Sequence, residues 1–152
     1  MKRLAILFAT GFGLGLSPVA SGTFGTLPGI LLAMAMAGLP ACRQVVIAAF
    51  LALLAVPLCD IAEKAFGRKD DGRIVADEYL TFPICMIGLP FAAHPWLLAL
   101  GFLTHRVCDI IKPSPARQIQ AVPGGVGIVL DDVISSLYAL ALNQLVWRVV
   151  SR

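Results

Sequence analysis

Long apolar stretches alternate with two short polar windows along this chain. Ten of the 21 charged residues fall within residues 60–78, and six fall within 104–132. The apolar runs at 27–41 and 44–59 are rich in Ala and Leu and predict helices. A run of about 16 residues covers about 24 Å as a helix, which is less than the roughly 30 Å of a bilayer core. Short membrane spans, a shallow hairpin and buried helices are therefore all compatible with these two runs.

The C-terminal half predicts two shorter helices followed by a long one. Residues 79–103 are apolar but contain three prolines, which predicts a break near 89–95. A Pro-Gly-Gly sequence then ends a loop, and 126–150 predicts the last helix. We predict an all-α protein, a compact bundle of about six helices that forms a single domain over 1–152.

The N-terminal residues have the charge pattern of a signal peptide without its usual composition. Lys2 and Arg3 precede an apolar stretch, but three glycines interrupt that stretch within 11–15. Residues 17–29 follow and are rich in hydroxyl groups and glycine. Such a segment can direct hydroxyls and N–H groups at an anion, although composition alone favours a plain connecting loop. The GxxxxGK[ST] pattern of an NTP-binding loop is absent from the sequence.

Composition indicates a membrane protein. Apolar residues make up 59% of the chain and charged residues 14%, with a mean hydropathy of +0.87. The net charge is only +3 and no run of basic residues occurs, so nucleic acid is excluded as an expected partner. The four cysteines form no CxxC pair and are expected to be small core residues. Both polar windows carry Lys and Arg, so the positive-inside rule predicts that both lie on the cytoplasmic side.

The acidic residues are the candidate metal ligands of this chain. All nine lie within 60–132, and adjacent pairs recur at 70–71, 77–78 and 131–132. Because an unpaired buried carboxylate costs several kcal/mol, acids in so apolar a chain should be paired, hydrated or bound to a metal. Carboxylates from converging helices, together with Asp109, would form an all-oxygen cluster. Such a cluster suits Mg²⁺ or Mn²⁺ better than zinc or copper.

Two basic residues beside Asp109 add the chemistry of a phosphate site. Arg106 lies three residues before Asp109 and Lys112 three residues after it, so a helix would place all three on one face. A metal held by carboxylates and flanked by Arg and Lys can neutralise phosphoryl oxygens as charge develops on the leaving oxygen. Surface salt bridges are the alternative, and that interpretation is favoured for the charged residues of 60–64.

Two other classes of protein stay open on these grounds. Buried acids in an apolar chain also mark the pathways of ion-conducting and transport proteins, and a structural membrane subunit would tolerate their loss. In a transporter the acids would be spread along the helices at different depths. Here they fall at predicted helix ends and in loops, which favours a surface-facing catalytic site.

Three sequence blocks carry a resemblance to a known family. They are residues 10–27 (TGFGLGLSPVASGTFGTL), 69–78 (KDDGRIVADE) and 106–132 (RVCDIIKPSPARQIQAVPGGVGIVLDD). In their order and spacing they resemble the phosphatidylglycerophosphatase A family of small membrane-associated enzymes. Two positions depart from the family's usual pattern, Cys108 in place of an aromatic residue and Thr81 in place of glycine. Both departures concern packing rather than ligands.

The resemblance implies a Mg²⁺-dependent enzyme that converts phosphatidylglycerophosphate, an anionic lipid, to phosphatidylglycerol by means of a metal-activated water. It implies a location in the bacterial inner membrane with the active site facing the cytoplasm, and it leaves the oligomeric state open. The expected catalytic residues are Asp70, Asp77, Glu78, Asp109 and Asp132. The expected metal ligands, for Mg²⁺ or alternatively Mn²⁺, are Asp77, Glu78, Asp109, Asp131 and Asp132. The expected phosphate-binding residues are Ser17, Gly22, Thr23, Arg106 and Lys112.

Overall fold

A computed structural model describes residues 2–152. Its only regular elements are helices, joined by loops, which confirms the all-α prediction. Within this range seven α-helices and two 3-10 helices are present and no strand occurs. The α-helices are α1 (Lys2–Ala9), α2 (Ser21–Ala35), α3 (Ala41–Phe66), α4 (Ala76–Thr81), α5 (Trp96–Ile111), α6 (Ala116–Ile119) and α7 (Gly125–Val150). The 3-10 helices are η1 (Leu14–Leu16) and η2 (Phe82–Met86). Seven α-helices compare with the expected number of about six, and two of them, α4 and α6, have only six and four residues.

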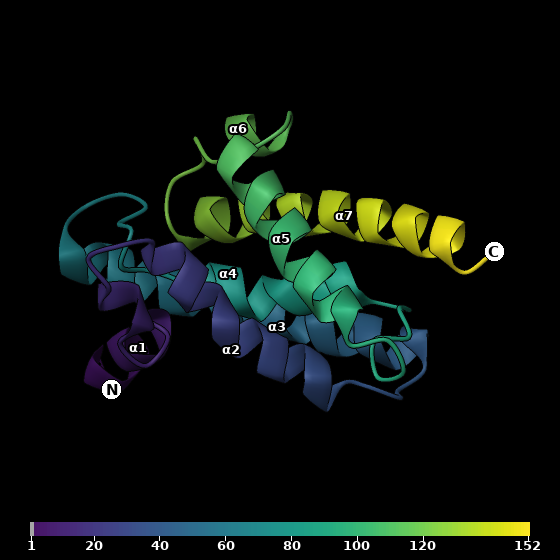
Figure 1. Cartoon of the computed structure of the whole chain (residues 1–152). Helices are drawn as coiled ribbons and strands as arrows, with labels where there is room; N and C mark the ends of the chain where they lie inside the picture. The colour runs from purple at the N-terminus through teal and green to yellow at the C-terminus, as the bar shows by residue number, and fades with distance from the viewer. Residues whose placement is uncertain (1) are drawn as a thin grey trace.

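The long helices α3 and α7 extend along the length of the molecule, and α5 crosses in front of α7 (Figure 1). The short α4–η2 segment packs against α2, α3 and α7. Nearly all of its side chains are buried. This short segment is therefore the centre of the bundle, and the first turn of α4 lies beside the ends of several longer helices.

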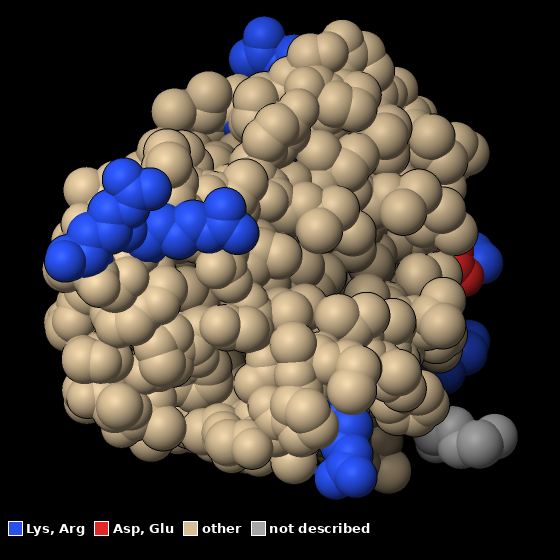
Figure 2. All heavy atoms as spheres, turned by 90° about the vertical axis from the view of Figure 1, so that its right-hand side faces the viewer, with Lys and Arg blue, Asp and Glu red and all other residues tan. Residues whose placement is uncertain are grey.

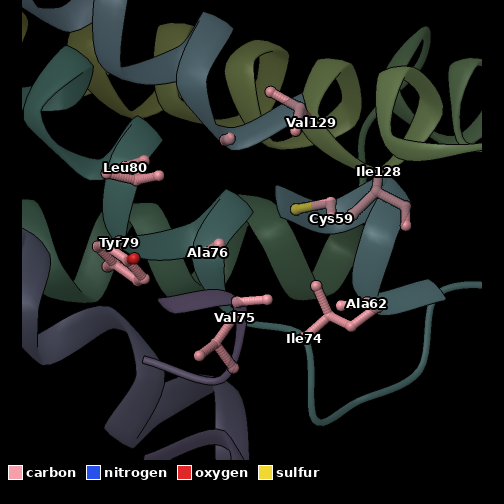
Figure 3. Packing of buried hydrophobic residues seen from close by; sticks show 11 residues of the cluster. Cys59, Ala62, Ile74, Val75, Ala76, Tyr79, Leu80, Ile128 and Val129 are labelled. Carbon is pink, nitrogen blue, oxygen red and sulfur yellow. The ribbon is translucent and has the colours of Figure 1, made fainter. Parts of the chain in front are cut away.

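Small residues allow these helices to approach the central segment closely. A Cβ atom built on Gly25 of α2 would lie 2.4 Å from the Cβ of Val75, and one on Gly29 would lie 2.6 Å from that of Phe82. In the core cluster of Figure 3, side chains from α3 and α7 meet residues 74–80. Cys59 and two other cysteines are buried and unpaired, as expected of core residues, whereas Cys42 is exposed. The expectation of a core position is therefore wrong for Cys42.

Two helices are long and apolar enough to cross a membrane, namely α3 and α7. Large apolar side chains are exposed along both helices, for example Phe50 and Leu53 on α3 and Leu145 on α7. The surface in Figure 2 shows a few Lys and Arg side chains, with Asp or Glu only at one edge. Such a surface indicates membrane association.

Helix boundaries differ from the predicted ones at the polar windows and at the start of α2, which begins at Ser21 rather than at residue 27. The break near 89–95 is confirmed, because no helix is formed between η2 and α5. In contrast, α3 continues beyond its apolar run to Phe66, where Gly67 ends it with a φ of 67°. The exposed ion pair between Lys64 and Asp60, at 2.6 Å and i,i+4 spacing, supports this extra turn. This pair also confirms the surface salt bridge expected there.

Candidate active site

One pocket brings together residues from all three sequence blocks. It has a volume of about 290 Å³ and lies between the start of α2, the loop before α4, the start of α4, the end of α5 and the second turn of α7. In Figure 1 the left-hand side of the molecule contains the end of α3, the start of α7 and the loop between α3 and α4. The pocket is lined by Ser21, Gly22, Asp70, Gly72, Ile74, Asp77, Glu78, Arg106, Asp109, Ile110, Lys112 and Asp132.

Arg106 forms ion pairs with two carboxylates of this pocket. Its Nη1 lies 2.8 Å from Oε2 of Glu78 on α4 and 2.9 Å from Oδ2 of Asp109, one turn further along α5. Thr26 of α2 donates a hydrogen bond of 2.9 Å to the same Glu78 oxygen. Arg106 is largely buried, with 15% of its side chain exposed. Charge-assisted contacts of this kind are short and strong, so they fix α2, α4 and α5 relative to one another.

Gly22 allows α2 to come close to this ion pair. A Cβ atom on Gly22 would lie 2.2 Å from Oε1 of Glu78 and 2.7 Å from Nη2 of Arg106. Both distances are far shorter than van der Waals contact, so any side chain at this position would displace the carboxylate or the guanidinium. The glycine is therefore required for the geometry of the site.

Lys112 connects the other side of the pocket to α7. It ends α5 in the left-handed conformation with a φ of 47°. Its Nζ forms an ion pair with Asp131 and lies 3.8 Å from Oδ1 of Asp109. Burial opposes the charge, but the hydrogen bond to Asp131 and the negative charges of Asp131, Asp109 and Asp132 together outweigh it and raise the pKa of Lys112. The ammonium group therefore stays charged at neutral pH.

Negative charge exceeds positive charge in the pocket. Five carboxylates and two cationic side chains line it. Burial raises the pKa of Glu78 to about 7, although the neighbouring Arg106 opposes this shift. Burial, followed by the charge of Glu78, also raises the pKa of Asp77 well above its usual value. An anion would be repelled from such a site unless a cation or protons compensated the excess charge.

The donor set fits a divalent metal ion in its chemistry. Oδ1 of Asp77 and Oδ2 of Asp132 are buried and have no hydrogen-bond partner among the described residues. Hard carboxylate oxygens are the ligands that Mg²⁺ and Mn²⁺ prefer. Within residues 2–152, however, no three His, Cys, Asp or Glu side chains are grouped so that they could hold a metal ion as they stand. The ion pairs of Arg106 and Lys112 engage oxygens that such a group would need.

Most of the predicted site residues meet in this pocket. The structure brings together Asp70, Asp77, Glu78, Asp109, Asp132, Gly22, Arg106 and Lys112. Asp131 adjoins the pocket through its ion pair with Lys112. Ser17 and Thr23 do not line the pocket. The hydroxyl of Ser17 instead donates to the carbonyl of Val19 at 2.8 Å and closes an exposed turn.

Five residues with a place at this site were not predicted, namely Ser21, Thr26, Gly72, Ile74 and Ile110. Ser21 lines the pocket and donates a 2.7 Å hydrogen bond to the carbonyl of Gly72, Thr26 holds Glu78, and Ile110 forms part of the wall. The sequence signal for Thr26 was its spacing of four residues from Gly22, which places both on one face of a helix. That signal becomes useful only once α2 is known to begin at Ser21.

Comparison with known proteins finds similarity over most of the chain. A family model described as Phosphatidylglycerophosphatase A matches residues 7–147. The chain is 35% identical over 137 residues to a protein of Escherichia coli K12 named "Phosphatidylglycerophosphatase A", covering 90% of this chain and 79% of that protein. It is 36% identical over 147 residues to a Haemophilus influenzae protein of the same name, covering 92% and 90%.

A third relative carries a different name. A Bacteroides thetaiotaomicron protein named "Putative phosphatidylinositol-3-phosphatase" is 32% identical over 154 residues, covering 93% of this chain and 94% of that protein. No solved structure matches the chain significantly.

Proposed function

The chain belongs to the phosphatidylglycerophosphatase A family, and from this premise we propose that it removes the terminal phosphate of phosphatidylglycerophosphate. The products are phosphatidylglycerol and inorganic phosphate. The enzyme is thus a phosphoric monoester hydrolase that acts on a lipid in phospholipid synthesis. The observation that carries the proposal is the pocket in which Arg106 joins Glu78 and Asp109, since this pocket gathers residues of all three family blocks.

Three groups of this pocket can hold the phosphate. Arg106 and Lys112 are the cationic side chains of its wall, and a guanidinium matches two phosphate oxygens at once. Ser21 and Gly22 form the start of α2, a helix of 15 residues. The free N–H groups and partial positive charge of a helix N-terminus favour an anion there.

We propose that a divalent cation, Mg²⁺ or Mn²⁺, is held by carboxylates chosen from Asp77, Glu78, Asp109, Asp131 and Asp132. When bound, such an ion supplies positive charge to the phosphoryl oxygens and lowers the pKa of a coordinated water. The excess of five carboxylates over two cationic side chains supports this proposal, because a phosphate anion needs further positive charge to bind.

The residues of the chain have defined tasks in the hydrolysis. The oxygen of a water molecule forms a bond to phosphorus, and the bond between phosphorus and the glycerol oxygen breaks. The attacking water loses a proton, and the leaving oxygen gains one. Oδ1 of Asp77 and Oδ2 of Asp132 are buried carboxylate oxygens without a protein partner, so they are the atoms at which a proton or a cation can be accepted. Arg106 and Lys112 hold the phosphoryl oxygens against the charge that develops.

We propose that the enzyme works at the cytoplasmic face of the bacterial inner membrane. Membrane association is indicated by α3 and α7. Basic residues near the pocket, among them Arg68 and Lys69 in the loop after α3 and Arg117 in α6, support a cytoplasmic position by the positive-inside rule. An anionic headgroup would also be attracted to a basic rim.

The test is phosphate release by the purified protein in detergent, with phosphatidylglycerophosphate as substrate and with either Mg²⁺ or EDTA present. We expect release with Mg²⁺, none with EDTA, and a loss of at least 100-fold in Asp132→Asn. The matched control is Asp60→Asn, since Asp60 is paired with Lys64 outside the pocket. No release from folded, Mg²⁺-loaded protein would refute the substrate.

Phosphatidylinositol 3-phosphate should be measured in parallel because one relative is named for that activity. A higher kcat/KM for this lipid than for phosphatidylglycerophosphate would keep the reaction class and change the substrate.

A further inference from the structure

One wall of the catalytic pocket is apolar and continues onto the outer surface of α5. Ile110 lines the pocket beside Asp109, yet it is 71% exposed. Leu103 and Val107 on the same helix are 61% and 51% exposed. Their spacing of four and three residues places all three on one face of α5. An apolar stripe therefore runs along α5 and ends in the catalytic pocket.

The opposite face of α5 is the one that packs into the protein. Leu97, Gly101, His105 and Cys108 are buried there. Arg106 and Asp109 lie at the boundary between the buried face and the stripe and point into the pocket. The stripe itself contains no charged residue, although a helix that faces water normally carries polar side chains on its outer face.

Across the pocket, the start of α2 also has an apolar border. Val19 and Leu27 are exposed on either side of Ser21 and Gly22. The close approach of Gly22 to Arg106 places this border next to the end of α5. Exposed apolar side chains thus occur beside the pocket on α5 and, in the sequence, close to the two α2 residues that line it.

We propose that the catalytic pocket opens sideways into the bilayer between α2 and α5, and that the substrate lipid enters there with its acyl chains against Leu103, Val107 and Leu27. This inference rests on the proposed function. Two features argue for a phospholipid as the occupant. The apolar stripe is continuous with the pocket, so acyl chains can stay in an apolar environment while the headgroup reaches the site. The cationic Arg106 and Lys112 complement the anionic headgroup at the end of the stripe.

The activity test compares a membrane substrate with a soluble one. In the Leu103→Ser, Val107→Ser double variant, we expect kcat/KM for long-chain phosphatidylglycerophosphate in vesicles to fall about 10-fold. Hydrolysis of a dibutyryl form that stays in solution should change less than 2-fold. The matched control is the Leu142→Ser, Leu145→Ser double variant, which changes two exposed leucines on α7 and should leave both activities unaltered. Equal losses with both substrates, or the same selective loss in the control, would overturn the proposal.

A second measurement does not depend on activity. A spin label on Val107→Cys in a Cys42→Ser background should be more accessible to oxygen than to a water-soluble nickel chelate in vesicles, whereas a label on Arg117→Cys should show the reverse. The buried native cysteines are not expected to react. A label at position 107 that is more accessible to the nickel chelate than to oxygen would refute the proposed opening between α2 and α5, even if the enzyme is active. A lipid-exposed label in a protein that releases no phosphate would refute the proposed function instead.

Discussion

At the scale of single residues, Arg106 determines how the site is held together. It is the one side chain that contacts both Glu78 and Asp109 at less than 3 Å within the described part of the chain. Lysine keeps the charge but loses the planar fork that can match two phosphate oxygens at once. Loss of a hydrogen bond to a charged group costs about 1.5–3 kcal/mol.

We therefore expect Arg106→Lys to lower kcat/KM about 10- to 100-fold in the phosphate-release assay, with a smaller effect on thermal unfolding. Arg117→Lys is the matched control, because Arg117 is exposed and lies outside the pocket. Activity in Arg106→Lys within 2-fold of the wild type would show that the fork geometry is not needed.

Gly22 gives a steric prediction at the same scale. An alanine there would place a methyl group 2.2 Å from Oε1 of Glu78, so the carboxylate or α2 must shift. Overpacking of this kind typically costs 1–3 kcal/mol, roughly. We expect Gly22→Ala to lose most of its activity and to unfold at a lower temperature in detergent.

The control for this prediction is Gly72→Ala. The nearest atom to a Cβ on Gly72 is the hydroxyl of Ser21 at 3.9 Å, which is ordinary contact. The unfolding temperature of Gly72→Ala should equal that of the wild type. If Gly22→Ala were as stable as Gly72→Ala, the close packing of α2 on Arg106 would be contradicted.

At the scale of elements, the first turn of α4 contains two buried carboxyl groups whose ionised forms are unfavourable in the folded protein. Asp77 and Glu78 both lie in this turn, and burial raises the pKa of each, to about 7 for Glu78. A carboxyl group whose pKa is raised by folding stabilises the folded state while it is protonated. That contribution is complete below the pKa of the unfolded chain and is lost as the pH rises through the folded value.

Metal-free protein in EDTA should accordingly unfold at a lower temperature at pH 8 than at pH 5.5. Glu78→Gln should reduce this dependence, because glutamine cannot ionise. Thermal unfolding followed by tryptophan fluorescence measures the effect. An equal change in unfolding temperature between pH 5.5 and pH 8 in the wild type and in Glu78→Gln would contradict the direction assigned to Glu78.

Some of the helices and boundaries could be predicted from the sequence, and others could not. The all-α class, the break near 89–95 and the last helix were predictable, because proline, glycine and apolar runs act locally. The start of α2 at Ser21 was not, because the segment 17–29 has the composition of a loop and becomes helical by packing Gly25 and Gly29 against the α4–η2 segment. Ser17 was expected in the site because of the family resemblance, whereas Ser21 could not be assigned to it before the start of α2 was known.

The acids of the site were easier to predict than its hydroxyl groups. A carboxylate in an apolar chain needs a partner wherever it lies, so Asp77, Asp109 and Asp132 were candidates before any geometry was known. The partners could not be assigned in the same way. The contact of Thr26 with Glu78 joins residues 52 positions apart, and only the tertiary structure brings them together.

At the scale of the whole molecule, the pocket and the polar loops lie at one end of α3 and α7, and Arg43 and Arg148 lie toward the opposite ends of these helices. If α3 crosses the bilayer, its two ends face different compartments. The exposed native Cys42 marks the first turn of α3, and Arg68 follows its last residue after one glycine.

We expect a membrane-impermeant maleimide to label Cys42 in intact spheroplasts but not in inverted vesicles. In a Cys42→Ser background, Arg68→Cys should show the reverse, since the pocket end is proposed to face the cytoplasm. Labelling of both positions from the cytoplasmic side alone would mean that α3 lies in one leaflet. The catalytic pocket would then still reach the bilayer through the stripe on α5, but without a membrane-spanning α3.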